Sequence, residues 1–225
     1  MSAPSLVTSA IFAVGDSGAG PNTFSGSIVV GSQANRILVV KINNNAAATA
    51  VRLVDSSGAS LSHGSFTRQT GGRSGSADVW YIVAPASATY TGIYVDSSYS
   101  FGQAVVELWQ DVDQTTPIGN IVPLGETTPP SVSVSSSTAN TVTDVTGFDF
   151  ADTASAVSGQ TVTQNANDAS KNVAGSYKAG ASSVSMGWTG ITGCQIAFEL
   201  LAASGGGGGG IPAGVLAALI EQGEM

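Results

Sequence analysis

Short stretches in which apolar residues alternate with polar ones recur along this chain, separated by clusters of Gly, Ser, Asn and Asp. This alternation is typical of half-buried β-strands, and the clusters favour tight turns. In Ala50–Val54, Val51 and Leu53 are predicted to point inward and Arg52 outward. Arg36–Ile42 is almost continuously apolar and is expected to form a central strand. Further strands are predicted at 27–30, 77–83, 92–95, 103–109, 131–135, 140–145, 161–164, 173–177, 182–188 and 194–201.

Strands this short and this regularly spaced predict an all-β fold, either an antiparallel sandwich or a barrel. We favour an antiparallel two-sheet β-sandwich of the jelly-roll kind. Residues 1–20 are interpreted as an arm or first strand, and residues 21–203 as the sandwich domain. The segment Ile118–Pro130 contains three prolines and is expected to link the two halves of that domain. We expect Ile37, Val39, Trp80, Val106 and Phe198 to be largely buried between the two sheets.

Two of the predicted strands resemble each other, residues 104–108 and 196–200. In both, every second residue is apolar and a glutamate, Glu107 or Glu199, stands on the opposite face. One interpretation is a pair of related strands near the centre of one sandwich. The alternative is that any half-buried strand has this pattern. Either way, the two carboxylates are expected to face solvent.

The C-terminal segment is unlike the rest of the chain. A run of six glycines, Gly205–Gly210, makes residues 204–210 a predicted flexible linker. In residues 211–225, Pro212 suits the first position of a short helix. So short a helix is not stable alone in water, so it is expected to dock on this subunit or on another. The predicted assembly interface is Ile211, Pro212, Val215, Leu216, Leu219 and Ile220. The alternative is a plain linker or a disordered end.

Charged residues make up only 10% of the 225 residues, so uncharged polar side chains must form most of the surface. The net charge of −8 disfavours nucleic acid as a partner, because an acidic surface repels phosphate. No apolar run approaches the roughly 20 residues of a membrane span, and the first residues lack the basic start of a secretory signal. A single cysteine, Cys194, excludes an intrachain disulfide. These features favour synthesis in a reducing cytoplasm.

Several motifs resemble parts of catalytic or metal sites, but the sequence lacks the other residues that such sites need. Gly15-Asp-Ser-Gly18 resembles the nucleophile region of chymotrypsin-like proteases, but the one histidine, His63, follows Ser17 instead of preceding it. One histidine and one cysteine do not make a zinc site. Asp111 and Asp113 are candidates for calcium binding, or else turn-forming residues. No cofactor is expected.

Two further functions, glycoside hydrolysis and sugar binding, are compatible with the types of side chain present. Glu107 and Glu199 could be imagined as a glycosidase pair. Trp80, Trp109 and Trp188 are either a sugar-stacking face or core residues.

Two stretches carry a resemblance to a known module, Val79-Trp-Tyr-Ile-Val-Ala-Pro85 and Val105-Val-Glu-Leu-Trp-Gln-Asp-Val-Asp-Gln-Thr-Thr-Pro-Ile118. With Trp188 and Ala197-Phe-Glu-Leu200, they resemble a β-sandwich module of phage virion structural proteins and environmental bacterial surface proteins. The resemblance covers about residues 24–203. The module's usual Ser-Gly before Val-Asp-Gln is here Gln110-Asp111. The resemblance implies a fold and no catalytic residues.

Together these features favour a bacteriophage virion structural protein, most of all a capsid decoration (cement or head-fibre) protein. Its expected partners are other virion proteins, the major capsid protein first, and further copies of itself in a homo-oligomer. Nucleic acid and membrane are not expected as partners. The alternatives are a phage tail or fibre protein that binds the host surface and a bacterial carbohydrate-binding or adhesin module. An enzyme is the weakest alternative.

Overall fold

The computed structural model describes residues 2–14, 22–44, 48–54, 60–61, 67–69, 77–96, 102–149, 152–166 and 171–204. These residues form β-strands and turns, and the strands assemble into three antiparallel sheets. The predicted all-β antiparallel sandwich is therefore confirmed, with more layers than the two sheets expected. The predicted C-terminal helix, 211–225, and the glycine linker from residue 205 lie outside the described residues.

The first half of the chain forms one nine-stranded sheet in the order β5-β4-β8-β2-β1-β9-β3-β7-β6. Its two end strands, β5 and β6, are joined only by the short segment 62–66, so the sheet curls until its edges approach each other. The strands are β1 (Ser5–Val14), β2 (Asn22–Val30), β3 (Ile37–Asn44), β4 (Ala50–Val54), β5 (Ser60–Leu61), β6 (Thr67–Gln69), β7 (Asp78–Val83), β8 (Ala88–Asp96) and β9 (Gly102–Gln110).

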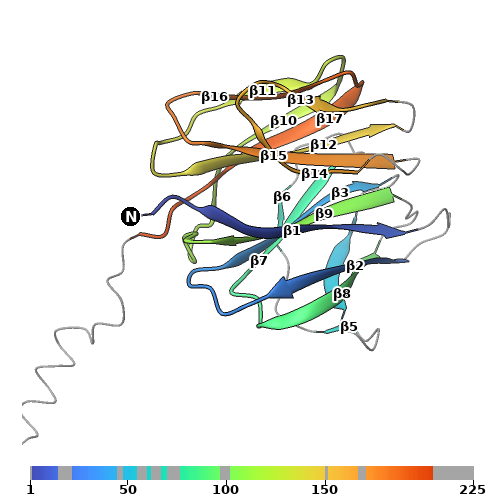
Figure 1. The fold of residues 1–225 in the computed structure, drawn as a ribbon, viewed down its shortest axis with the longest axis vertical. Helices are drawn as coiled ribbons and strands as arrows, with labels where there is room; N and C mark the ends of the chain where they lie inside the picture. The colour runs from blue at the N-terminus through green and yellow to red at the C-terminus, as the bar shows by residue number, and fades with distance from the viewer. Residues whose placement is uncertain are drawn as a thin grey trace, which may run out of the picture.

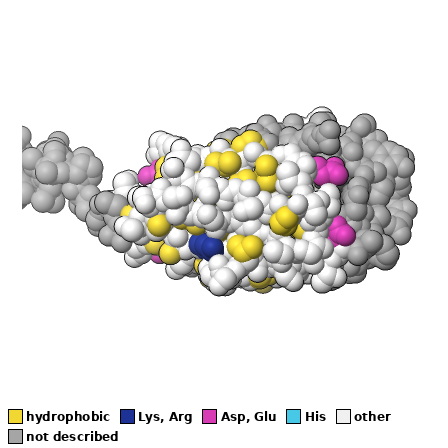
Figure 2. All heavy atoms as spheres, turned by 90° about the horizontal axis from the view of Figure 1, so that it is seen from above, with side chains coloured by type: hydrophobic (Ala, Val, Ile, Leu, Met, Phe, Trp, Pro, Cys, Tyr) yellow, Lys and Arg dark blue, Asp and Glu magenta, His cyan; other side chains and the backbone are white. Residues whose placement is uncertain are grey.

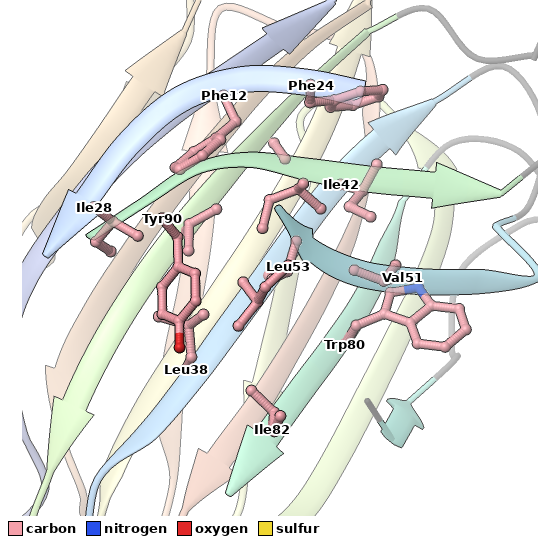
Figure 3. Close-up of a cluster of buried hydrophobic side chains, with 14 of the residues drawn as sticks. Phe12, Phe24, Ile28, Leu38, Ile42, Val51, Leu53, Trp80, Ile82 and Tyr90 are labelled. Atoms are coloured by element: carbon pink, nitrogen blue, oxygen red, sulfur yellow. The ribbon is translucent and has the colours of Figure 1, made fainter. Parts of the chain in front are cut away.

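The inner face of this curled sheet holds the largest apolar cluster. Side chains from strands on opposite sides of the curl point toward one another, among them Phe12, Phe24, Leu38 and Tyr90, each with no exposed surface (Figure 3). Burying a large apolar side chain stabilises the fold by about 1.5–3 kcal/mol, so this cluster is a major source of stability.

A five-stranded sheet, in the order β10-β17-β12-β15-β14, packs against β3 and β9 from outside the curl (Figure 1). Between the two sheets lies a second apolar cluster with Ile37, Val39, Trp109, Ile196 and Phe198. Strands β3 and β9 are therefore buried on both faces. The strands of this sheet are β10 (Ile118–Thr127), β12 (Thr141–Asp149), β14 (Thr161–Ala166), β15 (Lys171–Ala179) and β17 (Gly193–Leu200).

A three-stranded sheet covers the other face of the five-stranded sheet. It comprises β11 (Ser131–Val134), β16 (Val184–Thr189) and β13 (Ser155–Ala156). Val134, Met186 and Trp188 point down into the space between the sheets. Figure 2 views the molecule from this side and shows a surface dominated by uncharged polar groups. This agrees with the low charge content of the chain.

The strand predictions hold for the strongest patterns and are wrong at one linker. Ala50–Val54 is β4, with Val51 and Leu53 buried and Arg52 exposed. The five predicted core residues are all buried, but Trp80 and Val106 lie inside the curl of the nine-stranded sheet and not between two sheets. By contrast, Ile118–Thr127 is not a linker but the strand β10. It is an edge strand, and proline is tolerated at an edge because one side of the backbone needs no partner. Pro123 lies there, exposed.

Candidate functional site

A buried ion pair within the nine-stranded sheet faces the five-stranded sheet and is hydrogen-bonded to it. Lys41 Nζ of β3 lies 2.6 Å from Glu107 Oε1 of β9, and neither side chain has any exposed surface. Lys41 also donates to Thr143 Oγ1 of β12 at 2.7 Å. Charges taken out of water must be paired and hydrogen-bonded, because their desolvation is costly. The lysine therefore links β3, β9 and β12.

The remaining acceptor capacity of Glu107 is also used inside the protein. Thr163 Oγ1 of β14 donates to Glu107 Oε1 at 2.6 Å, and Trp109 Nε1 donates to Oε2 at 2.9 Å. A Cβ on Gly175 of β15 would lie 2.9 Å from Thr163 Oγ1 and 3.2 Å from both charged atoms of the pair. A glycine at this position therefore lets β15 pass close to the ion pair.

The expectation that Glu107 and Glu199 face solvent is wrong. Glu107 does stand on the face of its strand opposite Val106, but the five-stranded sheet covers that face. Glu199 is only 5% exposed. Burial alone would raise its pKa, but hydrogen bonds from Ser136, Asn140 and the Asn120 N–H outweigh burial and lower it. Both carboxylates are held by protein donors, and they lie in different interfaces, so they do not form a glycosidase pair.

A third buried carboxylate, Asp144 of β12, lies on the face of the five-stranded sheet that is turned away from the ion pair. Its Oδ1 accepts from the N–H and the hydroxyl of Ser176, and its Oδ2 accepts from Trp188 Nε1 and Gln195 Nε2, all within 2.7–2.8 Å. Burial raises the pKa of Asp144, while the charge of Lys41 and these hydrogen bonds oppose the increase. Asp144 thus fixes the three-stranded sheet, through Trp188, onto the five-stranded one.

The three tryptophans are core residues and not a sugar-binding face. Trp80 is 5% exposed, and Trp109 and Trp188 are not exposed at all. Trp109 also makes an edge-to-face contact with Tyr177, whose ring centroid lies 5.3 Å away. An aromatic platform for a sugar would need an accessible ring face, which these three side chains do not offer.

Asp111 and Asp113 shape the crossover from β9 to β10. Asp113 Oδ1 accepts from the backbone N–H groups of Thr115 and Thr116 at 2.8 Å each, which lowers the pKa of this carboxyl. The structure therefore uses Asp113 as a turn former. Asp111 has a φ of 60°, in the left-handed region that favours glycine. The resembling module has glycine at this position, and aspartate tolerates the same conformation.

The same crossover holds the end of the domain. Val112 forms an antiparallel bridge with Ala202, and Ala203 N donates to the carbonyl of Asp111 at 2.8 Å. The carbonyl of Pro4 accepts from Thr141 Oγ1 at 2.7 Å, close to the start of β12. The start of β1 and the exit of the chain at Ser204 therefore lie at one end of the molecule, as Figure 1 shows. This end is the candidate site, because the C-terminal segment leaves the domain here.

Other predicted site residues fall elsewhere. Cys194 is buried in β17 as a small apolar residue. Ser17, His63 and the predicted interface residues Ile211, Pro212, Val215, Leu216, Leu219 and Ile220 lie outside the described residues. Within the part of the chain that the structure describes, no group of three or more His, Cys, Asp or Glu side chains could hold a metal ion. None of the described residues belongs to a helix long and apolar enough to cross a membrane.

No protein-family model matches this chain, and comparison with curated proteins and with solved structures gave no match either.

Proposed function

We propose that this chain is a bacteriophage virion structural protein, a capsid decoration protein that acts by protein–protein assembly and not by catalysis. The observation that carries the proposal is the placement of the first and last described segments of the domain. The start of β1 and the exit at Ser204 lie at one end, so a partner could hold the domain by its C-terminal segment while the rest projects away.

The interior supports a scaffold role. Three of the described carboxylates are buried and accept hydrogen bonds from protein donors, and they do not line an open cleft. They are Glu107, Asp144 and Glu199. A catalytic acid or base must reach a substrate, and these groups do not. The buried tryptophans also count against carbohydrate binding. The virion location itself rests on the sequence resemblance.

The proposal names residues 211–220 as the contact with other virion proteins, the major capsid protein first. The apolar face formed by Val215, Leu216, Leu219 and Ile220 is large enough to contribute about 1.5–3 kcal/mol for each side chain that is fully buried. A single such contact is weak after the linker is ordered. Many copies on a symmetric particle would make it effective.

The test compares the parent chain with a double variant, Leu216→Asp with Leu219→Asp, in co-sedimentation with capsids of the phage whose genome carries its gene. The matched control is Ala217→Asp with Ala218→Asp, which adds the same two charges on the opposite side of the predicted helix. We expect the first variant to lose binding and the control to keep it, both with the parent's melting temperature. Equal binding by both variants would refute the role of this segment.

A further inference from the structure

The last described residues of the domain lie against the crossover from β9 to β10. Leu201 N donates to the carbonyl of Pro117 at 3.0 Å, and Ala203 N donates to the carbonyl of Asp111 at 2.8 Å. We call residues 201–204 the exit strap. Its side chains are half-buried or exposed, so polar contacts and not apolar burial hold most of it in place.

Glu199 controls one side of the exit strap through Asn140. Asn140 Nδ2 donates to Glu199 Oε1 at 2.6 Å, and Asn140 Oδ1 accepts from Ala202 N at 3.0 Å. An ionised carboxylate only accepts hydrogen bonds, so it turns the amide nitrogen of Asn140 toward itself and leaves the amide oxygen for the strap. A protonated carboxyl can donate instead, which favours the flipped amide and sets its NH₂ group against the N–H of Ala202.

Asp113 holds the end of the exit strap directly. Its carboxylate accepts from the N–H groups of Thr116 and Thr115 and is hydrogen-bonded to the backbone and the side chain of Ser204, the last residue of the strap. These hydrogen bonds lower the pKa of Asp113. The two carboxylates therefore grip the strap at two points, Ala202 and Ser204.

The surroundings of both carboxyls are uncharged. The elements packed against Glu199 present Asn120 of β10, Ser136 and Asn140 of the turn before β12, and Val142 of β12. Among the described residues, no charged side chain contributes to the pKa of Glu199 or of Asp113, although Asp111 belongs to the same crossover. Their own charge states therefore decide how these contacts respond to pH.

We propose that the exit strap is an acid-sensitive latch, closed by the ionised forms of Glu199 and Asp113 and opened when both are protonated. Both carboxyls have lowered pKa values, so their stabilisation is present above the ordinary values of 4.5 and 3.8 and is lost as the pH falls through the folded-state values. Opening adds residues 201–204 to the chain that follows the domain, roughly 13 Å when extended. This inference stands apart from the proposed function, because it concerns the described residues of the isolated chain.

The test is amide hydrogen exchange of the full-length chain at pH 7, measured by NMR. The double variant Glu199→Gln with Asp113→Asn carries the neutral forms at a pH where the parent is ionised. We expect the amides of Ala202 and Ala203 to lose protection by about tenfold, as for the loss of a hydrogen bond to a charged group. The amide of Val106 in the core should keep the protection that it has in the parent.

The matched control is Glu126→Gln with Asp152→Asn, which makes the same two changes of side chain away from the exit strap. Glu126 is exposed near the end of β10, and Asp152 accepts from the N–H of Thr192, just before β17 begins. The control should leave the exchange of the strap unchanged.

A second readout follows the parent chain through acid. The amide shift of Ala202 should titrate with a midpoint below 4.5, and Glu199→Gln should abolish this titration. Unchanged protection of the strap in the double variant, an equal loss in the control, or an equal loss at Val106 would each overturn the proposal. So would a midpoint at or above 4.5.

Discussion

Replacing Lys41 by Met tests the buried ion pair between the sheets. Methionine keeps the length and the apolar part of the side chain but removes the ammonium group. Glu107 then remains fully buried with only the donors of Thr163 and Trp109. Removing one member of a buried pair costs about 3–5 kcal/mol, because the other charge is left uncompensated. For a domain of this size that predicts a fall in melting temperature of about 6–20 °C.

The assay is urea unfolding at pH 7, followed by tryptophan fluorescence, for the parent, Lys41→Met, Glu107→Gln and the double variant. We expect the double variant to be less destabilised than the sum of the single variants, because it leaves no unpaired charge. Lys178→Met is the matched control, since Lys178 donates to the backbone carbonyl of Ser185 at an exposed position and not to a buried carboxylate of the described residues. A loss of less than about 1 kcal/mol for Lys41→Met, or strict additivity in the cycle, would refute the reasoning.

Three further predictions concern the same interior. Gly175→Ala should destabilise the domain by about 1–3 kcal/mol in the same urea assay, because its methyl group has no room beside the ion pair, whereas an unchanged midpoint would show that β15 can shift. Glu199→Gln should reduce the stability lost on acidification. The lowered pKa of Glu199 means that its contribution is present above the ordinary value of 4.5 and is lost as the pH falls through the folded-state pKa. Val106→Asp should leave no cooperative thermal transition by circular dichroism, since it buries an unpaired carboxylate, and a soluble variant with a sharp melt would contradict the strand phase.

Much of the fold could be predicted because strand alternation is a local signal. The phase of β4 and β9 followed from which alternate positions are apolar, and the structure places those side chains inward. The strand β10 was missed because the three prolines of Ile118–Pro130 suggested a linker. Only Pro123 lies within β10, and the position of this strand at the edge of a sheet makes that proline acceptable.

The environment of Glu107 could not be predicted from its own strand. A strand face that carries a charged residue is usually exposed to solvent. Whether another sheet covers that face depends on the tertiary arrangement, which the sequence of the strand does not reveal. One signal was available in the sequence. The nearly continuous apolar run of β3 contains a single lysine, Lys41, and a lysine in a strand buried on both faces needs an acidic partner.

The candidate site could be predicted only in part. The glycine run and the apolar segment are evident in the sequence, but the position of their exit is not. It depends on the bridge of Val112 to Ala202, which pairs residues far apart in the chain. That bridge places the exit of the chain next to β1. It also gives the Val-Asp-Gln-Thr-Thr-Pro motif, residues 112–117, a structural role, because Val112 of this motif holds the end of the domain.

The most direct test of the virion proposal is the mass of capsid particles incubated with this chain. Charge-detection mass spectrometry would compare the full-length chain, of 22.3 kDa, with a chain truncated after Ala203. We expect the full-length chain to add a mass that corresponds to a symmetric number of copies, and the truncated chain, still folded, to add none. No added mass with the full-length chain, or the same added mass with both chains, would contradict the account.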